Sequence, residues 1–255
     1  MNYITTVEMS RNWGISSRRI SFMCSKGRIE GTIKSGRSWL IPIDAKKPED
    51  LRKDRKMVGK TLRYYNEKAQ KYVAGTLDIE FLETQEIFLG YIPHGGSILD
   101  FGCGSGRDTK SFLEKGYVVE ALDGSKKLCD LANAYTGIKV KHMMFEEFEE
   151  VEKFDGIWAC ASILHVTKKE LPTILKKMVN ALKDNGTIYT SFKYGDFEGE
   201  RNGRYFTYLT EDSFGALIRQ VHDIKTEKMW ISNDVRADRG EEQWLNLILK
   251  KMAIC

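Results

Sequence analysis

Residues 98–109, ILDFGCGSGRDT, constrain the fold of this chain more than any other segment. Three apolar or aromatic residues surround one acid, Asp100, and glycines follow at positions 102, 104 and 106. An ordered glycine costs conformational entropy, so three at alternate positions indicate that something approaches the backbone too closely for side chains. Such a turn between a buried strand and a helix presents backbone N–H groups to a ligand. The segment therefore predicts a ligand site at the carboxyl edge of an open α/β sheet.

Length and composition narrow the class of protein. The chain has 255 residues, enough for one large domain or for a small and a medium one, and its 42% hydrophobic and 30% charged residues are typical of soluble globular proteins. No apolar run approaches the ~18 residues that span a bilayer, and MNYITTVEMS lacks the pattern of a signal peptide. Five scattered cysteines without a C-x-x-C pair favour reduced thiols and argue against structural zinc. We expect a cytoplasmic protein without membrane contact or metal.

The charge of the chain is unevenly distributed. Residues 1–60 contain 14 Lys and Arg against 6 Asp and Glu, whereas the remainder contains 26 against 30. A basic head on a mildly acidic body favours two domains, of which the head faces an anionic partner. A solvated basic face is the alternative.

The first forty residues predict a small winged helix-turn-helix domain. Thr5 and Glu8 have the spacing of a capping box for a helix that Gly14 ends, and Ser16 begins a second helix over SSRRISFMCSKG. TIKSGRSWLIP then contains two short apolar strands around a Ser-Gly turn. Two helices, a tight turn and a hairpin make up this motif.

The segment NWGISSRRISFMCSKGRIEGTIKSGRSWLIPIDAKKP resembles the DNA-binding domain of the MerR/excisionase type, over about residues 3–48. Its W-G-I-S turn and G-R-x-W-x-I-P wing are the most specific pieces. The resemblance implies that Ser17, Arg18 and Arg19 meet base edges and that Lys34 and Arg37 lie near phosphates. One such head has a small footprint, so useful affinity would need a homodimer on two half-sites. A packing domain that no longer binds nucleic acid is the alternative.

The rest of the chain alternates strands and helices, which is typical of a parallel α/β sheet. The charged stretch AKKPEDLRKDRKMVGK favours a linker, so we expect domains at 1–48 and 62–255 joined by residues 49–61. Strands are expected at 97–101, 117–122, 138–143, 154–160, 186–192, 223–231 and 243–251, and helices at 61–73, 78–92, 106–116, 125–135, 168–183 and 210–221. No helix separates the last two strands, which predicts an antiparallel last strand.

The position of an acid after the second strand indicates a cofactor that contains ribose. Asp123 in ALDGS follows Gly102 by 21 residues, close to the ~20 expected for a carboxylate that binds ribose hydroxyls. The glycine spacing is G-x-G-x-G, however, and not the G-x-G-x-x-G of dinucleotide-binding proteins.

With Asp100 ahead of it, this pattern resembles motif I of the class I S-adenosylmethionine (SAM)-dependent methyltransferases. The resemblance covers about residues 62–252 and includes ALDGS, FDGIWACASILHV and LKDNGTIYTSF. Asn185-Gly186 stands where the family usually has two glycines. The resemblance implies a Rossmann-like methyltransferase sheet, SAM as cofactor and S-adenosylhomocysteine (SAH) as product. An NAD enzyme or an inactive relative is the alternative.

The resemblance also implies a set of cofactor contacts. The glycines would line the methionine and ribose portions, Asp123 would hold both ribose hydroxyls, and Arg107 would pair with the cofactor carboxylate. An exposed first-turn arginine is the alternative for Arg107. The full implied set is Tyr65, Asp100, Gly102, Cys103, Gly104, Gly106, Arg107, Asp123, Gly124, Phe145, Glu146, Cys160 and Ala161.

Methyl transfer from a sulfonium chiefly needs alignment and a dry pocket. A base matters only for a protonated acceptor. We expect His165, which titrates near neutral pH when unperturbed, or Tyr65 in this role, with Tyr64, Lys193 and Tyr194 as further candidates. A packing or capping role is the alternative for His165.

The acceptor is predicted by exclusion. ACAS replaces the N/D-P-P-Y/F element of amino-group DNA methyltransferases. The sequence also lacks a Pro-Cys pair, whose cysteine is the nucleophile in methylation of cytosine C5. The compact body, with its arginine-rich FKYGDFEGERNGRYFTYL, is similar to small-molecule methyltransferases, including the tellurite-resistance type. Arg201, Arg204, Arg236 and Arg239 are candidates for an anion-accepting rim. The alternatives are an RNA-modifying enzyme and a transcription regulator whose body senses the cofactor.

Overall fold

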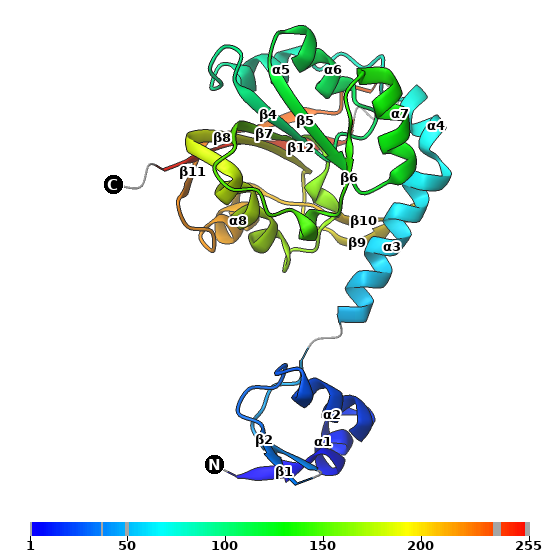
Figure 1. The fold of residues 1–255 in the computed structure, drawn as a ribbon, viewed down its shortest axis with the longest axis vertical. Coiled ribbons are helices and arrows are strands. Elements are labelled where there is room, and N and C mark those ends of the chain that lie inside the picture. The colour runs from blue at the N-terminus through cyan, green and yellow to red at the C-terminus, as the bar shows by residue number, and fades with distance from the viewer. Residues whose placement is uncertain (1, 37, 49–50, 237–240, 253–255) are drawn as a thin grey trace. The chain divides into compact units, whose positions relative to one another are not determined.

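The computed structural model describes residues 2–36, 38–48, 51–236 and 241–252. The chain forms two compact units, Met1–Lys53 and Asp54–Cys255 (Figure 1). Within the described ranges no helix is long and apolar enough to cross a membrane.

The first unit, the head, consists of two helices and a three-stranded sheet. Helix α1 (Thr6–Trp13) has a capping box at its start and Gly14 in the left-handed conformation at its end, as predicted. Helix α2 (Ser17–Ser25) is capped by Ser16. Strands β2 (Ile33–Ser35) and β3 (Ser38–Pro42) form the expected hairpin, and β1 (Tyr3–Thr5), which is too short to show a period, pairs with β3. The core of this unit contains Met9, Ile20, Met23, Cys24, Ile29 and Ile41.

The stretch expected as a linker is largely helical. Helix α3 (Leu51–Glu67) begins inside residues 49–61 and continues into the second unit. Lys, Arg, Leu and Met have favourable helix propensity, so the charged composition of this stretch does not oppose a helix. The chain turns at Lys68 before α4 (Ala69–Ala74), so the helix expected at 61–73 is two helices.

The second unit, the body, is built on a seven-stranded sheet of order β11-β12-β8-β7-β4-β5-β6. Its parallel strands are β4 (Ser97–Phe101), β5 (Val118–Asp123), β6 (Lys141–His142), β7 (Phe154–Ala159) and β8 (Leu182–Lys193). The last strand, β12 (Gln243–Lys251), runs antiparallel to both β8 and β11 (Ile224–Asn233). This confirms the predicted Rossmann-like sheet and its antiparallel last strand. Because β4 has β5 on one side and β7 on the other, the strand order reverses at the carboxyl end of β4.

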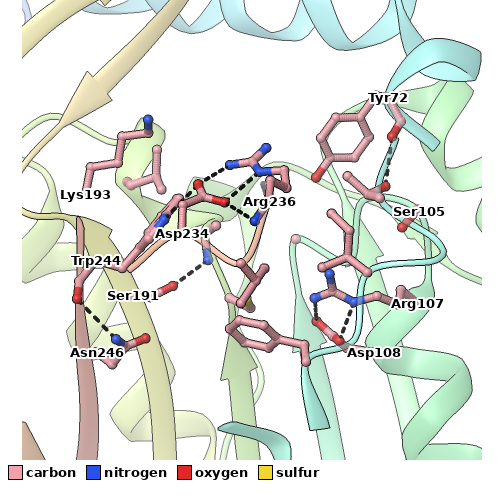
Figure 2. Close-up of a pocket in the computed structure, with 18 of the residues that line it drawn as sticks. Tyr72, Ser105, Arg107, Asp108, Ser191, Lys193, Asp234, Arg236, Trp244 and Asn246 are labelled. Carbon is pink, nitrogen blue, oxygen red and sulfur yellow. Dashed lines mark hydrogen bonds and ion pairs between the residues drawn. The ribbon is translucent and has the colours of Figure 1, made fainter. Parts of the chain in front are cut away.

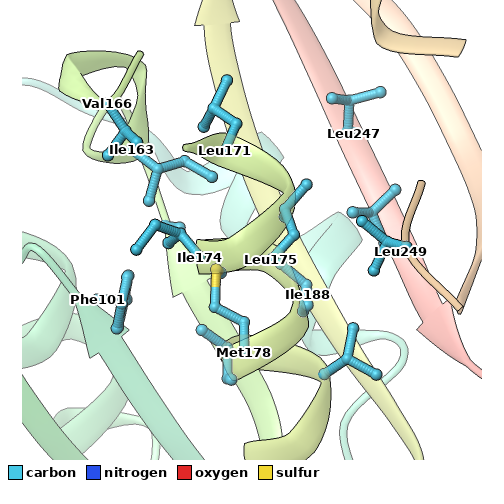
Figure 3. Packing of buried hydrophobic residues seen from close by; sticks show 14 of the residues in the cluster. Phe101, Ile163, Val166, Leu171, Ile174, Leu175, Met178, Ile188, Leu247 and Leu249 are labelled. Atoms are coloured by element: carbon cyan, nitrogen blue, oxygen red, sulfur yellow. The ribbon is translucent and has the colours of Figure 1, made fainter. Parts of the chain in front are cut away.

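Helices cover both faces of the sheet. Helices α5 (Leu82–Leu89), α6 (Arg107–Glu114) and α7 (Lys126–Thr136) pack on one face, with Phe88 and Phe112 against Trp158. On the other face lie α8 (Leu171–Ala181) and α9 (Glu211–Ile218). Figure 3 shows Leu175 and Met178 of α8 among the side chains of β4, β8 and β12.

A hairpin that the sequence analysis missed lies beside α3. Strands β9 (Glu198–Arg201) and β10 (Arg204–Thr207) pair with Arg201 opposite Arg204. Asn202 and Gly203 both have positive φ, the conformation of a two-residue hairpin turn. An Asn-Gly pair is the strongest short signal for such a turn, so the sequence did carry it. The backbone N–H of Tyr205 donates to Thr61 Oγ1 of α3 (2.9 Å), which fixes the hairpin against that helix.

Candidate active site

A cleft with two halves lies at the carboxyl edge of the parallel strands. The first, the β5 half, is lined by Gly104, Asp123, Phe145 and Ser162 among others. The second, the β8 half, has a volume of about 1040 Å³ including its open mouth and extends past Lys193 (Figure 2). The two halves share Tyr65, Tyr72, Gly102, Ala161 and His165, so they form one continuous cleft.

Gly102 allows the first turn to fit between two neighbouring segments. It has φ +88°, and a Cβ there would come within 2.5 Å of Ser162 Cβ and 3.1 Å of the Phe145 ring. A larger residue would therefore displace both segments of the β5 half. Ser162 Oγ, which lines this half, is buried and has no hydrogen-bond partner among the described residues.

Asp123 ends β5 with its carboxylate in the cleft. Its Oδ2 accepts from the Gly104 N–H (3.0 Å) and its Oδ1 accepts from the Ser125 N–H (2.7 Å). Burial nevertheless raises the pKa of this carboxyl. Each carboxylate oxygen has a second lone pair. Asp123 can therefore accept hydrogen bonds from two hydroxyl groups of a ligand. These bonds would replace the hydrogen bonds to water that the carboxylate loses on burial.

An apolar slot lies beside Asp123. Phe145, in the 3₁₀ turn Phe145–Glu147, stacks on Phe101 with ring centroids 4.6 Å apart. Leu62 of α3 and Met144 line the same half, and Glu146 is exposed at its edge. The slot suits a flat aromatic ring with polar edges.

A buried carboxylate cluster fixes Arg107. Asp108 accepts from Arg107 Nε (2.9 Å) and Nη2 (2.8 Å), from Gln85 Nε2 (2.7 Å) and from Trp158 Nε1 (2.9 Å). Arg107 lines the β8 half, and its bonds to Asp108 use Nε and Nη2 but not Nη1. Burial and the neighbouring Asp108 raise the pKa of Asp100 well above the ordinary value of an aspartate.

Gly106 differs from its predicted role. It lines neither half of the cleft, although the sequence predicts a cofactor contact. Its φ is +81°, and a Cβ there would come within 2.8 Å of Thr136 Cγ2 and 3.2 Å of Ala132 Cβ. Gly106 thus allows α6 to pack closely on α7.

Tyr65 and His165 meet where the two halves join. His165 Nδ1 lies 2.6 Å from the carbonyl oxygen of Tyr205, which can only accept, so Nδ1 carries the hydrogen. His165 Nε2 therefore accepts from the Tyr65 hydroxyl (2.8 Å). Arg204 Nη1 donates to Tyr65 Oη at 3.4 Å.

The titration expected for His165 is wrong. Burial and, to a smaller extent, the charge of Arg204 lower its pKa to about 4, although the hydrogen bond to Tyr205 acts in the opposite direction. His165 is therefore neutral at neutral pH. Burial also raises the pKa of Tyr65, so its hydroxyl keeps its proton.

Partly buried ion pairs lie along the β8 half (Figure 2). Asp234 accepts from Arg236 and from Trp244 Nε1 (3.1 Å), which lowers the pKa of this carboxyl to about 2 despite its burial. Lys193 Nζ pairs with Glu242 and lies over the rings of Phe206, Tyr208 and Trp244. The cations of this half are thus mostly neutralised by the protein.

The other predicted residues divide by location. Cys103 and Cys160 line the β8 half, and burial raises the pKa of Cys160 to about 12, which keeps the thiol protonated. Gly124 lines the β5 half. Tyr194 donates to Glu211 (2.9 Å) outside both halves, and Arg201 is exposed on the β9–β10 hairpin. Arg37 and Arg239 lie outside the described residues.

Several lining residues were not predicted from the sequence. Tyr72, Asp234, Trp244 and Asn246 come from α4, β12 and the segment between β11 and β12. Tyr72 follows Tyr65 by two helical turns, a spacing that could have placed both on one face. No local pattern marks the others.

The comparisons with known proteins agree with this geometry. A family model described as a methyltransferase domain matches residues 98–186. An uncharacterized methyltransferase of Staphylococcus carnosus is 28% identical over 61% of this chain and 79% of its own length.

Solved structures extend the likeness to the fold. The 1,6-didemethyltoxoflavin-N1-methyltransferase of Burkholderia thailandensis, solved with SAH, is 19% identical with a TM-score of 0.65 over 87% of this chain and 99% of its own. A SAM-dependent methyltransferase of Leishmania major is 21% identical with a TM-score of 0.62 over 78% and 86%. Residues 98–186 of this chain therefore match a methyltransferase domain, and the body has the fold of SAM-dependent methyltransferases.

Proposed function

We propose that this protein methylates a small molecule that binds in the β8 half of the cleft. The observation that carries the proposal is the enclosure of this half by Trp244, Phe206 and Tyr72 on three different segments. Its size is that of a small-molecule pocket. The Burkholderia protein was solved with 1,6-didemethyltoxoflavin, which is also a small molecule, and this agrees with the proposal.

We assign the β5 half to the adenosine of SAM. Asp123 has lone pairs for the two ribose hydroxyls, and Phe145 offers a face for adenine. Arg107 Nη1 and the turn at Gly102 would then meet the methionine portion at the junction of the halves. When bound, SAM supplies a methyl group activated by its sulfonium, and the electron pair of the broken carbon–sulfur bond stays on the sulfur of SAH.

Tyr65 and His165 would handle the proton of the acceptor. Because the Tyr65 hydroxyl donates to His165, its oxygen can accept an N–H or O–H of the acceptor. As the acceptor forms its bond to the methyl carbon, its proton passes to Tyr65 Oη, and the Tyr65 proton passes to His165 Nε2. An N–H or O–H becomes strongly acidic when its heavy atom gains a methyl group, so a base with a pKa near 4 suffices.

Methyl-labelled SAM tests the proposed acceptor class. The full chain would be incubated with separated small molecules, RNA, DNA and protein from a cell extract. Label in the small-molecule fraction supports the proposal, whereas label in RNA would favour the RNA-modifying alternative. Tight SAM binding without any transfer would favour a cofactor sensor.

We further propose that the head binds DNA. The observation that favours this is the first turn of α2, where Arg18 is exposed, together with exposed Lys34 on β2. The N-terminal end of the second helix is the part that enters the major groove in helix-turn-helix proteins. A homodimer on two half-sites would raise the affinity of so small a footprint.

Selection from a random duplex library would test DNA binding. Arg18→Ala should weaken binding to a selected site by about 1–3 kcal/mol. Arg219→Ala, which removes an exposed charge from the body, is the matched control. Failure to enrich any duplex would leave the head as a packing domain. Binding that requires SAM would indicate a regulator.

A further inference from the structure

The β8 half opens to the surface through a groove with positively charged walls. Lys68, Lys71, Arg204 and Arg236 line this groove, against the carboxylates Asp78 and Glu80. The groove shares Tyr72, Thr76, Ile79, Arg204, Val235 and Arg236 with the β8 half, so it leads directly into the cleft. Lys68 and Lys71 are matched by Asp78 and Glu80, and Arg236 is paired with Asp234, so Arg204 gives the groove an excess of positive charge. Such an excess attracts anions and speeds their association.

Farther in, Arg204 differs from the other cations of the cleft. Arg107 is paired with Asp108, Lys193 with Glu242 and Arg236 with Asp234. Arg204 instead lies over the rings of Tyr64 (4.5 Å) and Phe206 (5.0 Å). Within the part of the chain that the structure describes, Arg204 has no carboxylate partner, and its Nε is a buried donor without an acceptor. The aromatic rings therefore hold a guanidinium whose charge the described residues do not neutralise.

The position of this charge ties it to the chemistry. Arg204 Nη1 lies 3.4 Å from Tyr65 Oη, and Tyr65 lines both halves of the cleft at their junction. With SAM placed as proposed above, its sulfonium would bring a second positive charge towards the same junction. Two cations near each other in a partly buried site repel strongly unless an anion lies between or beside them. An anionic ligand in the β8 half would neutralise the charge of Arg204, which the described residues leave without a carboxylate partner.

On the basis of the small-molecule function proposed above, we propose that the methyl acceptor is an oxyanion, a carboxylate or a phosphate, that enters between Lys68 and Lys71 and binds Arg204. The anionic group anchors the acceptor on the guanidinium, and the atom to be methylated reaches the junction beside Tyr65. Tyr64, whose ring lies under Arg204 and 4.7 Å from Lys68 Nζ, holds both cations along the path. Charge-assisted hydrogen bonds to guanidinium are the strong ones, so Arg204 contributes most of the anchoring.

Ion-exchange fractionation tests the charge of the acceptor. Small molecules from a cell extract would be separated on an anion exchanger and a cation exchanger before incubation with the full chain and methyl-labelled SAM. We expect the accepting molecules on the anion exchanger. Acceptance confined to the unbound or cationic fractions would overturn this proposal and leave the small-molecule function standing. Acceptance only by RNA, DNA or protein, or none at all, would overturn both.

A second arm separates the two kinds of oxyanion. Treating the accepting fraction with phosphatase before the assay should abolish acceptance by a phosphate ester and leave a carboxylate acceptor unaffected. Either result is consistent with an oxyanion once the fraction binds the anion exchanger.

Matched arginine variants test the anchor itself. Arg204→Gln should raise the apparent KM for the accepting fraction about 10- to 100-fold, while the Kd for SAM stays within about twofold. Arg204→Lys, which keeps the charge, should raise this KM by a smaller factor. Arg201→Gln is the control, because Arg201 stacks on Phe197 and Tyr208 of the same region but does not line the cleft. Equal effects of Arg204→Gln and Arg201→Gln would overturn the proposal.

The groove provides a variant that does not disturb the interior. Lys68 and Lys71 are exposed, so Lys68→Gln with Lys71→Gln should fold normally even if Arg204→Gln does not. We expect kcat/KM to fall about 3- to 10-fold at low salt and its dependence on ionic strength to weaken. An unchanged salt dependence would contradict entry of an anion through this groove.

Discussion

The hydroxyl of Tyr65 donates to Nε2 of His165 across 2.8 Å, although the two residues are 100 positions apart in the sequence. The direction of this bond is set by a third group, the carbonyl of Tyr205, which holds the hydrogen of the imidazole on Nδ1. Tyr65 therefore faces the cleft as a hydrogen-bond acceptor. The arrangement makes Tyr65, rather than His165, the group that meets the acceptor.

Replacing Tyr65 with Phe removes this acceptor oxygen and keeps the ring. We expect kcat to fall about 10²-fold or more, the usual contribution of a positioned proton acceptor, while SAM binding changes little. Steady-state kinetics together with calorimetric titration of SAM would measure both. Tyr194→Phe is the control, because the Tyr194 hydroxyl bonds to Glu211 outside the cleft. If Tyr194→Phe costs as much as Tyr65→Phe, the assigned proton path is wrong.

Asp123→Asn should weaken SAM binding. Asn has one acceptor oxygen where Asp123 has two, so its amide would face the N–H of Gly104 or of Ser125. The loss of one charge-assisted bond and the clash of donors should raise the Kd for SAM by at least about tenfold. Asp130→Asn, on the exposed face of α7, removes a charge near the same strand and is the control. An unaltered Kd in Asp123→Asn would remove Asp123 from the ribose site.

The buried imidazole of His165 should make folding stability depend on pH. Its pKa of about 4 lies below the unfolded value near 6.5, so the unfolded chain binds the proton first as the pH falls. The stabilising contribution is fully present above about pH 6.5 and is lost progressively as the pH falls to about 4. The total loss is about 3 kcal/mol.

Urea denaturation between pH 4 and 7 would measure this contribution. His165→Gln retains a hydrogen-bonding side chain without the titration, so its free energy of unfolding should decline less over this range than that of the parent. Parallel decline in the two proteins would show that His165 titrates normally in the folded chain.

Two glycine substitutions distinguish packing from backbone strain. Gly106 and Gly116 both have positive φ, but a Cβ at Gly106 meets Thr136 at 2.8 Å and one at Gly116 meets nothing within 4 Å. Gly116→Ala should lower the free energy of unfolding by about 1 kcal/mol, because alanine is strained in the left-handed conformation. Gly106→Ala should lower it by about 1–3 kcal/mol more, because the added Cβ overpacks against α7.

Gly106→Ala also tests whether Gly106 contacts the cofactor. Since Gly106 lines neither half of the cleft, the Kd for SAM should change little in Gly106→Ala at temperatures where the variant is folded. A large loss of SAM affinity without a loss of stability would restore the cofactor contact that the sequence predicts.

The sequence predicts those parts of the fold that local physics specifies. The apolar run at β4, the glycines after it and Asp123 at the end of β5 are neighbours along the chain or follow one regular unit. Their places follow from the geometry of strand, turn and helix. The same holds for the capping box of Thr5 and Glu8, which is complete within one helical turn. The β9–β10 turn was equally local, and its Asn-Gly signal was overlooked.

The electrostatics of the cleft required the tertiary structure. The pKa of His165 is lowered because α3 and the β9–β10 hairpin bury it, and Arg204 lies beside Tyr65 because Asn202 and Gly203 turn the chain back towards α3. No pattern in the sequence shows which arginine has a carboxylate partner. The sequence by itself thus determined the class of fold and predicted the cofactor, since both depend on short segments with fixed spacing. Only the tertiary structure decided which side chains are neutral, paired or left charged, because burial and partner distance arise from segments that meet only when the chain is folded.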